Sequence, residues 1–234
     1  MTTAEATDPA ATLTPPSILP LGDAALTIRL GDRVDLALAA RVRDCAGRIQ
    51  AAQLGAVREI VPAYAALTVF YDPARTGYAE MVRLLDRIVQ EPQAPPGADG
   101  MPREHMPRVH RIPVRYDGAD LLDVAARTGL TRDEVVARHS APTYTVLLLG
   151  FVPGFAYLGE LDPRLVLPRR AEPRRRVAAG SVAIAGAQTA VYPLETPGGW
   201  HLIGRTTTVL FDPDRIPPAR LAPGDRVRFM PVDG

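Results

Sequence analysis

The chain has 234 residues, of which 47% are hydrophobic and 23% are charged, values that exclude a disordered or collagen-like protein. Its 27 basic and 26 acidic residues leave a formal net charge of +1, so the charge balance does not favour a nucleic-acid-binding protein. Every basic residue is arginine, which excludes a P-loop lysine, a Schiff-base lysine and a biotin-carrying lysine. A GC-rich genome would explain this bias, but the chemical exclusion holds whatever its cause.

The first 16 residues are expected to form a disordered tail. They contain neither a basic segment nor an apolar stretch of the kind found in secretory signals. No apolar run approaches the roughly 18 residues that a membrane span requires. The single cysteine, Cys45, cannot form an internal disulfide, which fits a reducing compartment. We therefore expect a cytoplasmic protein that does not bind membranes.

Residues 17–91 are predicted to form a small α+β domain with helices on one face of an antiparallel sheet. Four short stretches bounded by turn residues predict strands. Apolar residues three or four positions apart predict two helices, because this spacing places them on one helical face. Cys45 lies on such a face and is expected to pack in the core. The expected elements are strands 18–21 and 25–30, a helix carrying Val34, Leu38, Val42, Cys45 and Ile49, strands 57–61 and 66–71, and a helix over residues 78–89.

Residues 92–107 are rich in proline and glycine and are expected to form a linker. Residues 108–234 are predicted to begin with a strand and two short helices, with Thr131 and Glu134 forming a capping box at the second helix. Short strands separated by Gly and Pro then predict a closed barrel or a sandwich. The expected elements are strand 109–116, helices 121–128 and 132–139, and strands 144–149, 181–185, 189–192, 200–205, 209–211 and 227–229.

Three stretches of the second domain differ from ordinary core sequence. Residues 150–159 (GFVPGFAYLG) combine three glycines with three aromatic residues and predict a constrained loop suited to a flat or anionic ligand; a tight barrel corner is the alternative. Residues 179–189 are unusually rich in small side chains and include Gln188, whose amide can both donate and accept hydrogen bonds. Residues 192–206 hold the sole tryptophan, Trp200, with His201 and Arg205.

Two histidines are candidate general bases, although both also have a structural interpretation. His201 follows Trp200, so their side chains are expected on opposite faces of a strand. His139 ends a short helix, where it could complement the helix dipole. Five arginines between positions 169 and 176 predict either a solvated loop or a surface that attracts an anionic substrate or partner. No His, Cys, Asp or Glu spacing supports a metal site.

Taken together and in this order, the three stretches resemble the family of 5-oxoprolinase B subunits, also described as allophanate hydrolase subunit 1 or the kinase-A-inhibitor family. The resemblance extends from about residue 18 to residue 232. It is most specific over residues 150–165, 179–194 and 196–206, the last containing TPGGWHLIGRT.

Four positions depart from the family pattern. Val152 and Ala156 stand where Ala and Pro are common, and Ala187 and Ala190 stand where Gly is common. These small substitutions are expected to reshape the floor of a pocket slightly and leave the assignment intact.

The resemblance implies a fold class of an α+β N-terminal domain followed by an all-β, cyclophilin-like barrel. It also implies that the chain assembles with the C and A subunits of an ATP-dependent 5-oxoprolinase, which converts 5-oxoproline, ATP and water into L-glutamate, ADP and phosphate. The chain itself is expected to bind no cofactor and to be inactive alone, with ATP used through a partner subunit.

If the chain is a 5-oxoprolinase subunit, as the resemblance implies, several residues are expected to contact the substrate. Arg205 is expected to hold the substrate carboxylate, Gln188 the ring amide, and His201 or His139 the attacking water. The expected substrate-binding residues are Gly150, Phe151, Pro153, Gly154, Phe155, Tyr157, Gly180, Ser181, Gln188, Tyr192, Gly198, Gly199, Trp200 and Arg205.

Other functions remain open at this point. A regulatory protein that inhibits a sensor histidine kinase through its cyclophilin-like domain is the principal alternative. A prolyl isomerase follows from fold analogy alone. Urea-related carboxyl transfer would require a biotin carrier on another chain.

Overall fold

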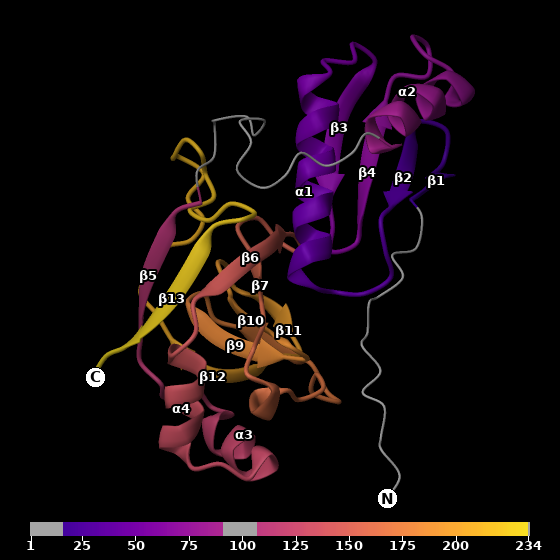
Figure 1. Ribbon diagram of the computed structural model, residues 1–234. Coiled ribbons are helices and arrows are strands. Elements are labelled where there is room, and N and C mark those ends of the chain that lie inside the picture. The colour runs from indigo at the N-terminus through magenta and orange to yellow at the C-terminus, as the bar shows by residue number, and fades with distance from the viewer. Residues whose placement is uncertain (1–15, 91–106, 234) are drawn as a thin grey trace, which may run out of the picture.

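The computed structural model describes residues 16–90 and 107–233 and combines helices with a four-stranded sheet and a mixed-sheet barrel (Figure 1). The predicted tail (residues 1–16) and linker (residues 92–107) lie outside the described residues, apart from residues 16 and 107. Within the described ranges, no helix is both long enough and apolar enough to cross a membrane.

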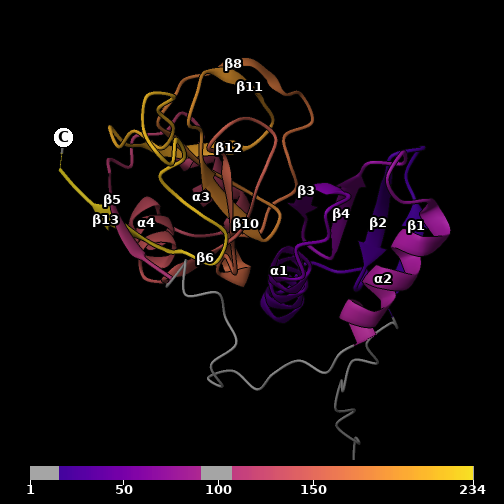
Figure 2. The same ribbon diagram turned by 90° about the horizontal axis from the view of Figure 1, so that it is seen from above.

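The N-terminal part is an antiparallel sheet with two helices on one face, and Figure 2 shows that α1 is the helix nearer the barrel. The strand order is β1-β2-β4-β3. Strands and helices follow one another as the sequence predicted. The elements are β1 (Ser17–Pro20), β2 (Ala25–Arg29), α1 (Leu36–Ala51), β3 (Val57–Pro62), β4 (Ala66–Tyr71) and α2 (Tyr78–Gln90).

Helix α1 begins where Asp35 caps it, because the Asp35 carboxylate accepts a hydrogen bond from the Leu38 N–H at 2.7 Å. Val34 precedes this cap and is 54% exposed, so its assignment to the buried helical face was wrong. Cys45 is buried in the core of the N-terminal part, as predicted, and burial raises the pKa of its thiol. The apolar spacing thus identified the helix but not its first turn.

The barrel is a seven-stranded sheet in the order β12-β9-β10-β7-β6-β13-β5. Strands β13 and β5 are parallel and the other neighbours are antiparallel. A bridge between Arg115, just after β5, and Arg205 at the end of β12 joins the two outer strands and nearly closes the barrel. The strands are β5 (Val109–Val114), β6 (Tyr144–Leu149), β7 (Ala156–Gly159), β9 (Ser181–Ala185), β10 (Gln188–Val191), β12 (His201–Arg205) and β13 (Arg226–Pro231).

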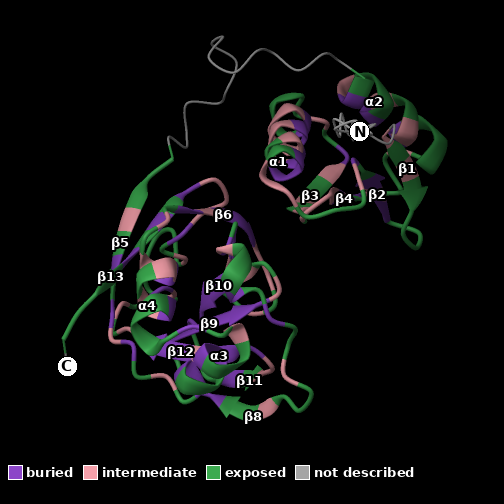
Figure 3. Ribbon diagram, turned by 60° about the horizontal axis from the view of Figure 1, so that its bottom comes forward, coloured by how far each residue is buried: buried purple, intermediate pink, exposed green. Residues whose placement is uncertain are grey.

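Helices α3 (Leu121–Thr128) and α4 (Arg132–Ser140) cover one end of the barrel (Figure 1). The capping box predicted for Thr131 and Glu134 is present at the start of α4. A short 3-10 helix, η1 (Pro163–Leu165), contacts both helices. The barrel interior is filled by aliphatic and aromatic side chains that alternate with outward-facing residues, and buried residues concentrate in β9, β10 and β12 (Figure 3).

Three details of the barrel differ from the sequence prediction. The second half of the stretch predicted as a loop at residues 150–159 forms strand β7, because it pairs with both β6 and β10. Strands β8 (Arg174–Val177) and β11 (Thr196–Gly198) were not predicted and form a separate two-stranded sheet. Residues 209–211 make only an isolated bridge, between Phe211 and Ala219, so the strand predicted there was wrong.

Candidate functional site

The three distinctive stretches meet on the outer face of β9 and β10, where they form an aromatic cluster. Phe155 lies 4.9 Å from Tyr157, 5.3 Å from Tyr192 and 5.7 Å from Trp200 between ring centroids, in edge-to-face arrangements. Such geometry is favourable because the ring edges and faces carry opposite partial charges. Three small residues make room for the rings on this face: Ala183, Ala185 and Ala190. The small residues of the second stretch therefore accommodate aromatic side chains of the other two.

Several of the predicted ligand-binding glycines and their neighbours shape this cluster. Gly154 has φ +77°, and a Cβ there would lie 2.6 Å from the Cβ of Phe211. A Cβ at Gly198 would overlap the hydroxyl of Tyr192. Phe151 is 60% exposed and packs edge-on against Phe155. The remaining predicted positions of this region also lie beside the cluster: Gly150 and Pro153 before β7, and Gly199 beside Trp200.

Gln188 lies at the start of β10 and is contacted by Tyr64, a residue that the sequence did not single out. Tyr64 projects from the turn between β3 and β4, and its hydroxyl is 3.0 Å from Gln188 Nε2 and 3.2 Å from Oε1. Its ring packs edge-on against Tyr157 at 5.6 Å. Burial raises the pKa of Tyr64 to about 12, so the hydroxyl is neutral at physiological pH. No spacing in the sequence links Tyr64 to a residue 124 positions later.

A pocket of about 250 Å³ adjoins Gln188 at the junction between the N-terminal part and the barrel. The start of α1 forms one wall and the ends of β6, β7 and β10 form the other. Its lining is mainly apolar but includes the carboxylates of Asp35 and Glu160 together with the Gln188 amide. Residues from both parts of the chain therefore contribute to this pocket.

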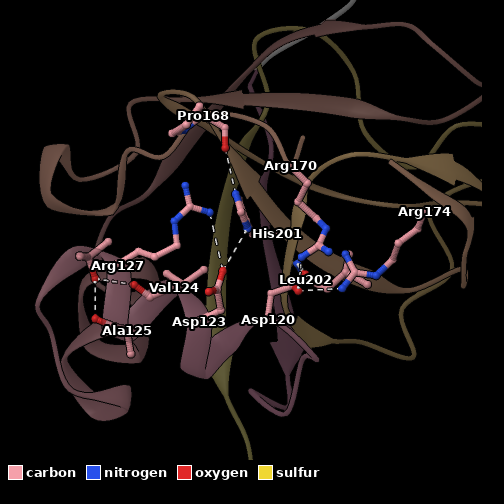
Figure 4. Close-up of polar contacts among 11 residues, drawn as sticks. Asp120, Asp123, Val124, Ala125, Arg127, Pro168, Arg170, Arg174, His201 and Leu202 are labelled. Carbon is pink, nitrogen blue, oxygen red and sulfur yellow. Dashed lines mark hydrogen bonds and ion pairs between the residues drawn. The ribbon is translucent and has the colours of Figure 1, made fainter. Parts of the chain in front are cut away.

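Some of the five arginines between positions 169 and 176 form ion pairs with carboxylates, and others do not. Arg170 and Arg174 donate hydrogen bonds at 2.8 and 2.7 Å to the same oxygen of Asp120, which is 4% exposed (Figure 4). The other Asp120 oxygen accepts from the Leu202 N–H at 2.7 Å. Burial opposes ionisation of Asp120, but these donors and the two positive charges outweigh it and lower its pKa. Arg176 pairs with Glu195.

His201 faces away from the aromatic cluster, toward α3, whereas Trp200 lies within the cluster. It is fully buried, and its Nε2–H donates to the carbonyl of Pro168 at 2.9 Å (Figure 4). Its Nδ1 lies 4.0 Å from the Asp123 carboxylate and has no hydrogen-bond partner among the described residues. The imidazole thus anchors the Pro168 segment and does not reach the surface that the aromatic residues form.

His139 is a core residue, and the catalytic role expected for it conflicts with its surroundings. It is fully buried, stacks on Phe229 at 4.6 Å, and places Nδ1 2.7 Å from the Tyr116 hydroxyl and Nε2 2.8 Å from the Thr189 hydroxyl. Burial lowers its pKa to about 3, so the ring is neutral. Because both ring nitrogens are occupied inside the barrel, His139 cannot position a substrate water.

Arg205 and Gln188 are not in contact and lie on opposite sides of β9, toward its two ends. Arg205 pairs with Ser181 at one end of β9, whereas Gln188 pairs with Ala185 at the other end. Four residues of a strand span about 13 Å along β9, which lies between the strands that carry the two side chains. Arg205 also donates to Asp117 at 2.7 Å. The Arg205 guanidinium is thus held by Asp117, and the carboxylate-binding role expected for it stays a prediction.

Gly180 and Ser181 lie near Arg205, at the same remote end of β9. A Cβ at Gly180 would overlap the Thr206 carbonyl oxygen, and the Gly180 N–H donates to the Tyr192 carbonyl at 2.7 Å. Ser181 is buried. These residues hold a corner of the barrel. Among the described residues, no group of three His, Cys, Asp or Glu side chains could hold a metal ion.

Comparison with known proteins gives consistent matches over nearly the whole chain. Residues 16–221 match the family described as carboxyltransferase domain, subdomain C and D. The chain is 44% identical over 214 residues to the B subunit of 5-oxoprolinase from Escherichia coli O157:H7, covering 90% of this chain and 94% of that protein. It is 39% identical over 221 residues to the B subunit of 5-oxoprolinase from Bacillus subtilis (strain 168), covering 91% of each chain.

A solved structure, that of TTHA0988, is similar in fold. It superposes with a TM-score of 0.77 at 42% identity, over 90% of this chain and 40% of that one. The chain thus spans about two fifths of the solved protein, which carries additional sequence beyond the shared region.

Proposed function

The chain belongs to the carboxyltransferase domain, subdomain C and D family, and on this premise we propose that it is the B subunit of an ATP-dependent 5-oxoprolinase. The observation that carries the proposal is the match to the Escherichia coli protein at 44% identity over 94% of its length. The naming of the relatives as B subunits supports assembly with further subunits, which we take to be C and A. The histidine-kinase inhibitor, the principal alternative, gains no support from these relatives.

The chemistry of the reaction suits a divided enzyme. A lactam is a poor electrophile because its nitrogen lone pair is delocalised onto the carbonyl. Transfer of the ATP γ-phosphoryl group to the amide oxygen would release ADP and activate the carbonyl carbon. Addition of water to that carbon, release of phosphate and cleavage of the ring C–N bond would then give glutamate. We assign nucleotide binding to the large partner subunit, because this chain has no lysine for a P-loop. The chain then holds no cofactor of its own and contributes binding surface for the activated substrate.

Within this chain, we assign substrate binding to Gln188 and to the accessible edge of the aromatic cluster, where Phe151 is 60% exposed and Tyr157 is half-buried, whereas Phe155, Tyr192 and Trp200 are buried inside the cluster. The cluster gathers side chains from all three distinctive stretches, and Gln188 supplies amide hydrogen bonds beside it. His201 supports this surface by anchoring the Pro168 segment. We further propose that the chain has two domains and that its barrel is of the cyclophilin-like class.

Reconstitution with the candidate C and A subunits tests the function. The complete mixture is expected to release glutamate from 5-oxoproline only with ATP, and omission of this chain is expected to abolish release. Persistence of activity without this chain, or its absence from a complete mixture, would contradict the proposal. Inhibition of autophosphorylation of a cognate sensor kinase would then favour the regulatory role.

A further inference from the structure

Arg169 is a free guanidinium in a run whose other members are mostly neutralised. Arg170 and Arg174 bind Asp120, and Arg176 binds Glu195. Arg169 is exposed and forms no hydrogen bond or ion pair with a described residue. An unpaired guanidinium with its donors in a planar fork is well suited to a carboxylate ligand.

The backbone holds Arg169 at the edge of the aromatic cluster. On one side, Leu167 pairs with Gly186, two residues before Gln188. On the other side, the Arg170 N–H donates to the Gly199 carbonyl at 2.8 Å, next to Trp200. Two residues of chain span at most about 7 Å, so the Cα of Arg169 is no farther than this from that of Leu167, and Arg169 directly precedes Arg170, which contacts the residue before Trp200.

The electrostatic environment of the tyrosines agrees with this placement. Burial raises the pKa values of Tyr64, Tyr157 and Tyr192, and the charge of Arg169 acts in the opposite direction on each of them. Arg169 therefore lies near enough to influence tyrosines that belong to the cluster or border it.

Gln188 provides a neutral polar group on the side toward the pocket. If the Tyr64 hydroxyl accepts from Nε2, Oε1 remains free to accept from a ligand; if it donates to Oε1, Nε2 remains free to donate. In either case, Tyr64 fixes the amide and leaves one of its atoms for the complementary group of a ligand amide.

The charges around the site favour one orientation of a bound ligand. Glu160 lines the pocket beside Gln188 and has no partner among the described residues, whereas Asp35 is paired with Arg33 at 2.6 Å, so Glu160 disfavours an anionic group at that end. Arg169 favours an anionic group at the other end. A ligand with a neutral amide at one end and a carboxylate at the other satisfies both requirements, with aromatic rings beside its apolar ring atoms.

We propose that Arg169 and Gln188 form the two ends of a subsite for a small cyclic amide bearing a carboxylate, with Tyr64 as the positioning residue for the Gln188 amide. The inference rests on the proposed function, and it assigns the carboxylate contact to Arg169, which has no partner among the described residues, in place of Arg205, which is paired with Asp117. In this subsite, Arg169 contacts the carboxylate of the ligand and Gln188 contacts its ring amide.

The test uses the reconstituted complex with all its subunits and compares 5-oxoproline with 2-pyrrolidinone, the same lactam without its carboxylate. Arg169→Ala is expected to raise KM for 5-oxoproline about 10- to 100-fold, the range for loss of one charge-assisted contact, with KM for ATP unchanged. The preference of the complex for 5-oxoproline over 2-pyrrolidinone is expected to fall by the same factor. Arg175→Ala is the matched control, because Arg175 is exposed in the same run and has no partner among the described residues.

Tyr64→Phe tests the amide end, since it retains the ring and removes the hydroxyl. Its expected effect is a rise of a few-fold in KM for 5-oxoproline, absent in a Gln188→Ala background because the two residues act through one contact. Independent, additive effects would overturn the positioning role of Tyr64. Thermal unfolding of each variant separates these effects from loss of folding.

The outcomes distinguish the two proposals. A wild-type complex without 5-oxoprolinase activity would overturn both. An active wild-type complex in which Arg169→Ala and Arg175→Ala behave alike, or in which the substrate preference is unchanged, would overturn the Arg169 subsite alone.

Discussion

Replacement of Asp120 by alanine is expected to destabilise the barrel by about 3 kcal/mol, because breaking a buried charge pair costs roughly 3–5 kcal/mol. The Asp120 side chain is 5% exposed and holds three donors: Arg170, Arg174 and the Leu202 N–H. The two arginine side chains are 32% and 25% exposed, so water can partly replace the lost carboxylate. We therefore use the lower end of the range. The half-buried Leu202 N–H also loses its acceptor, which contributes about 1 kcal/mol of the loss.

Urea and thermal unfolding would measure the change. Trp200, the sole tryptophan, is 5% exposed near the affected segment and provides a fluorescence signal. A loss of about 3 kcal/mol corresponds to a fall in Tm of about 6–12 °C for a protein of this size. Asp120→Asn, which retains an acceptor but not the charge, is expected to lose about half as much. Glu172→Gln serves as control, since Glu172 is exposed in the same loop and has no partner among the described residues.

A loss below about 1 kcal/mol for Asp120→Ala, at an unchanged urea m-value, would refute the reasoning. It would mean that the cost of removing Asp120 and its two arginines from water is as large as the free energy of their interaction.

Three further predictions concern the core, the glycine turns and a helix cap. Because the pKa of His139 is about 3 in the folded chain and about 6.5 when unfolded, the unfolded state binds the extra proton, and stability should fall as pH decreases from about 6.5, by up to 1.4 kcal/mol per pH unit. The unfolding free energy, measured with urea at pH 7, 6 and 5, should change less with pH in His139→Gln than in the wild type. An equal pH dependence would contradict a neutral, buried His139. Gly180→Ala should cost more than Gly186→Ala in thermal unfolding, because both have positive φ but only Gly180 has a backbone oxygen, that of Thr206, where the Cβ would lie. Thr131→Ala should cost about 1 kcal/mol in urea unfolding through loss of the cap, and no measurable change would argue against the capping box.

The local elements of the fold could be predicted from the sequence because their signals lie within short windows. The apolar spacing at Leu38, Val42, Cys45 and Ile49 identified α1, and Thr131 with Glu134 marked the start of α4. Errors arose where pairing with a distant segment decided the outcome. Strand β7 forms because β6 and β10 flank it, although its sequence is rich in glycine and aromatic residues.

The candidate site was predicted only in part. The three stretches were recognised by composition, and the structure brings their aromatic residues together at Phe155. The sequence could not show that Gln188 and Arg205 lie toward opposite ends of β9, because their positions depend on the register of β9 with both neighbouring strands. Tyr64 was missed because it belongs to another part of the chain and its role arises from one hydrogen bond across 124 residues.

The histidines illustrate the same limit. The sequence gives no reason to prefer His139 or His201 as the functional histidine, because the properties of an imidazole depend on its surroundings. The barrel encloses His139 between two hydroxyls, and the Pro168 carbonyl holds His201 toward α3.

By itself, the sequence determined the types of most elements, the capping box at Thr131 and Glu134, the exclusion of lysine chemistry and the three stretches that identify the family, because each depends on residue type and short-range spacing. The tertiary structure alone decided which arginines of residues 169–176 are paired, which groups surround each buried histidine and which side chains share a face. Those properties depend on strand register and on contacts between distant segments, so no local pattern encodes them.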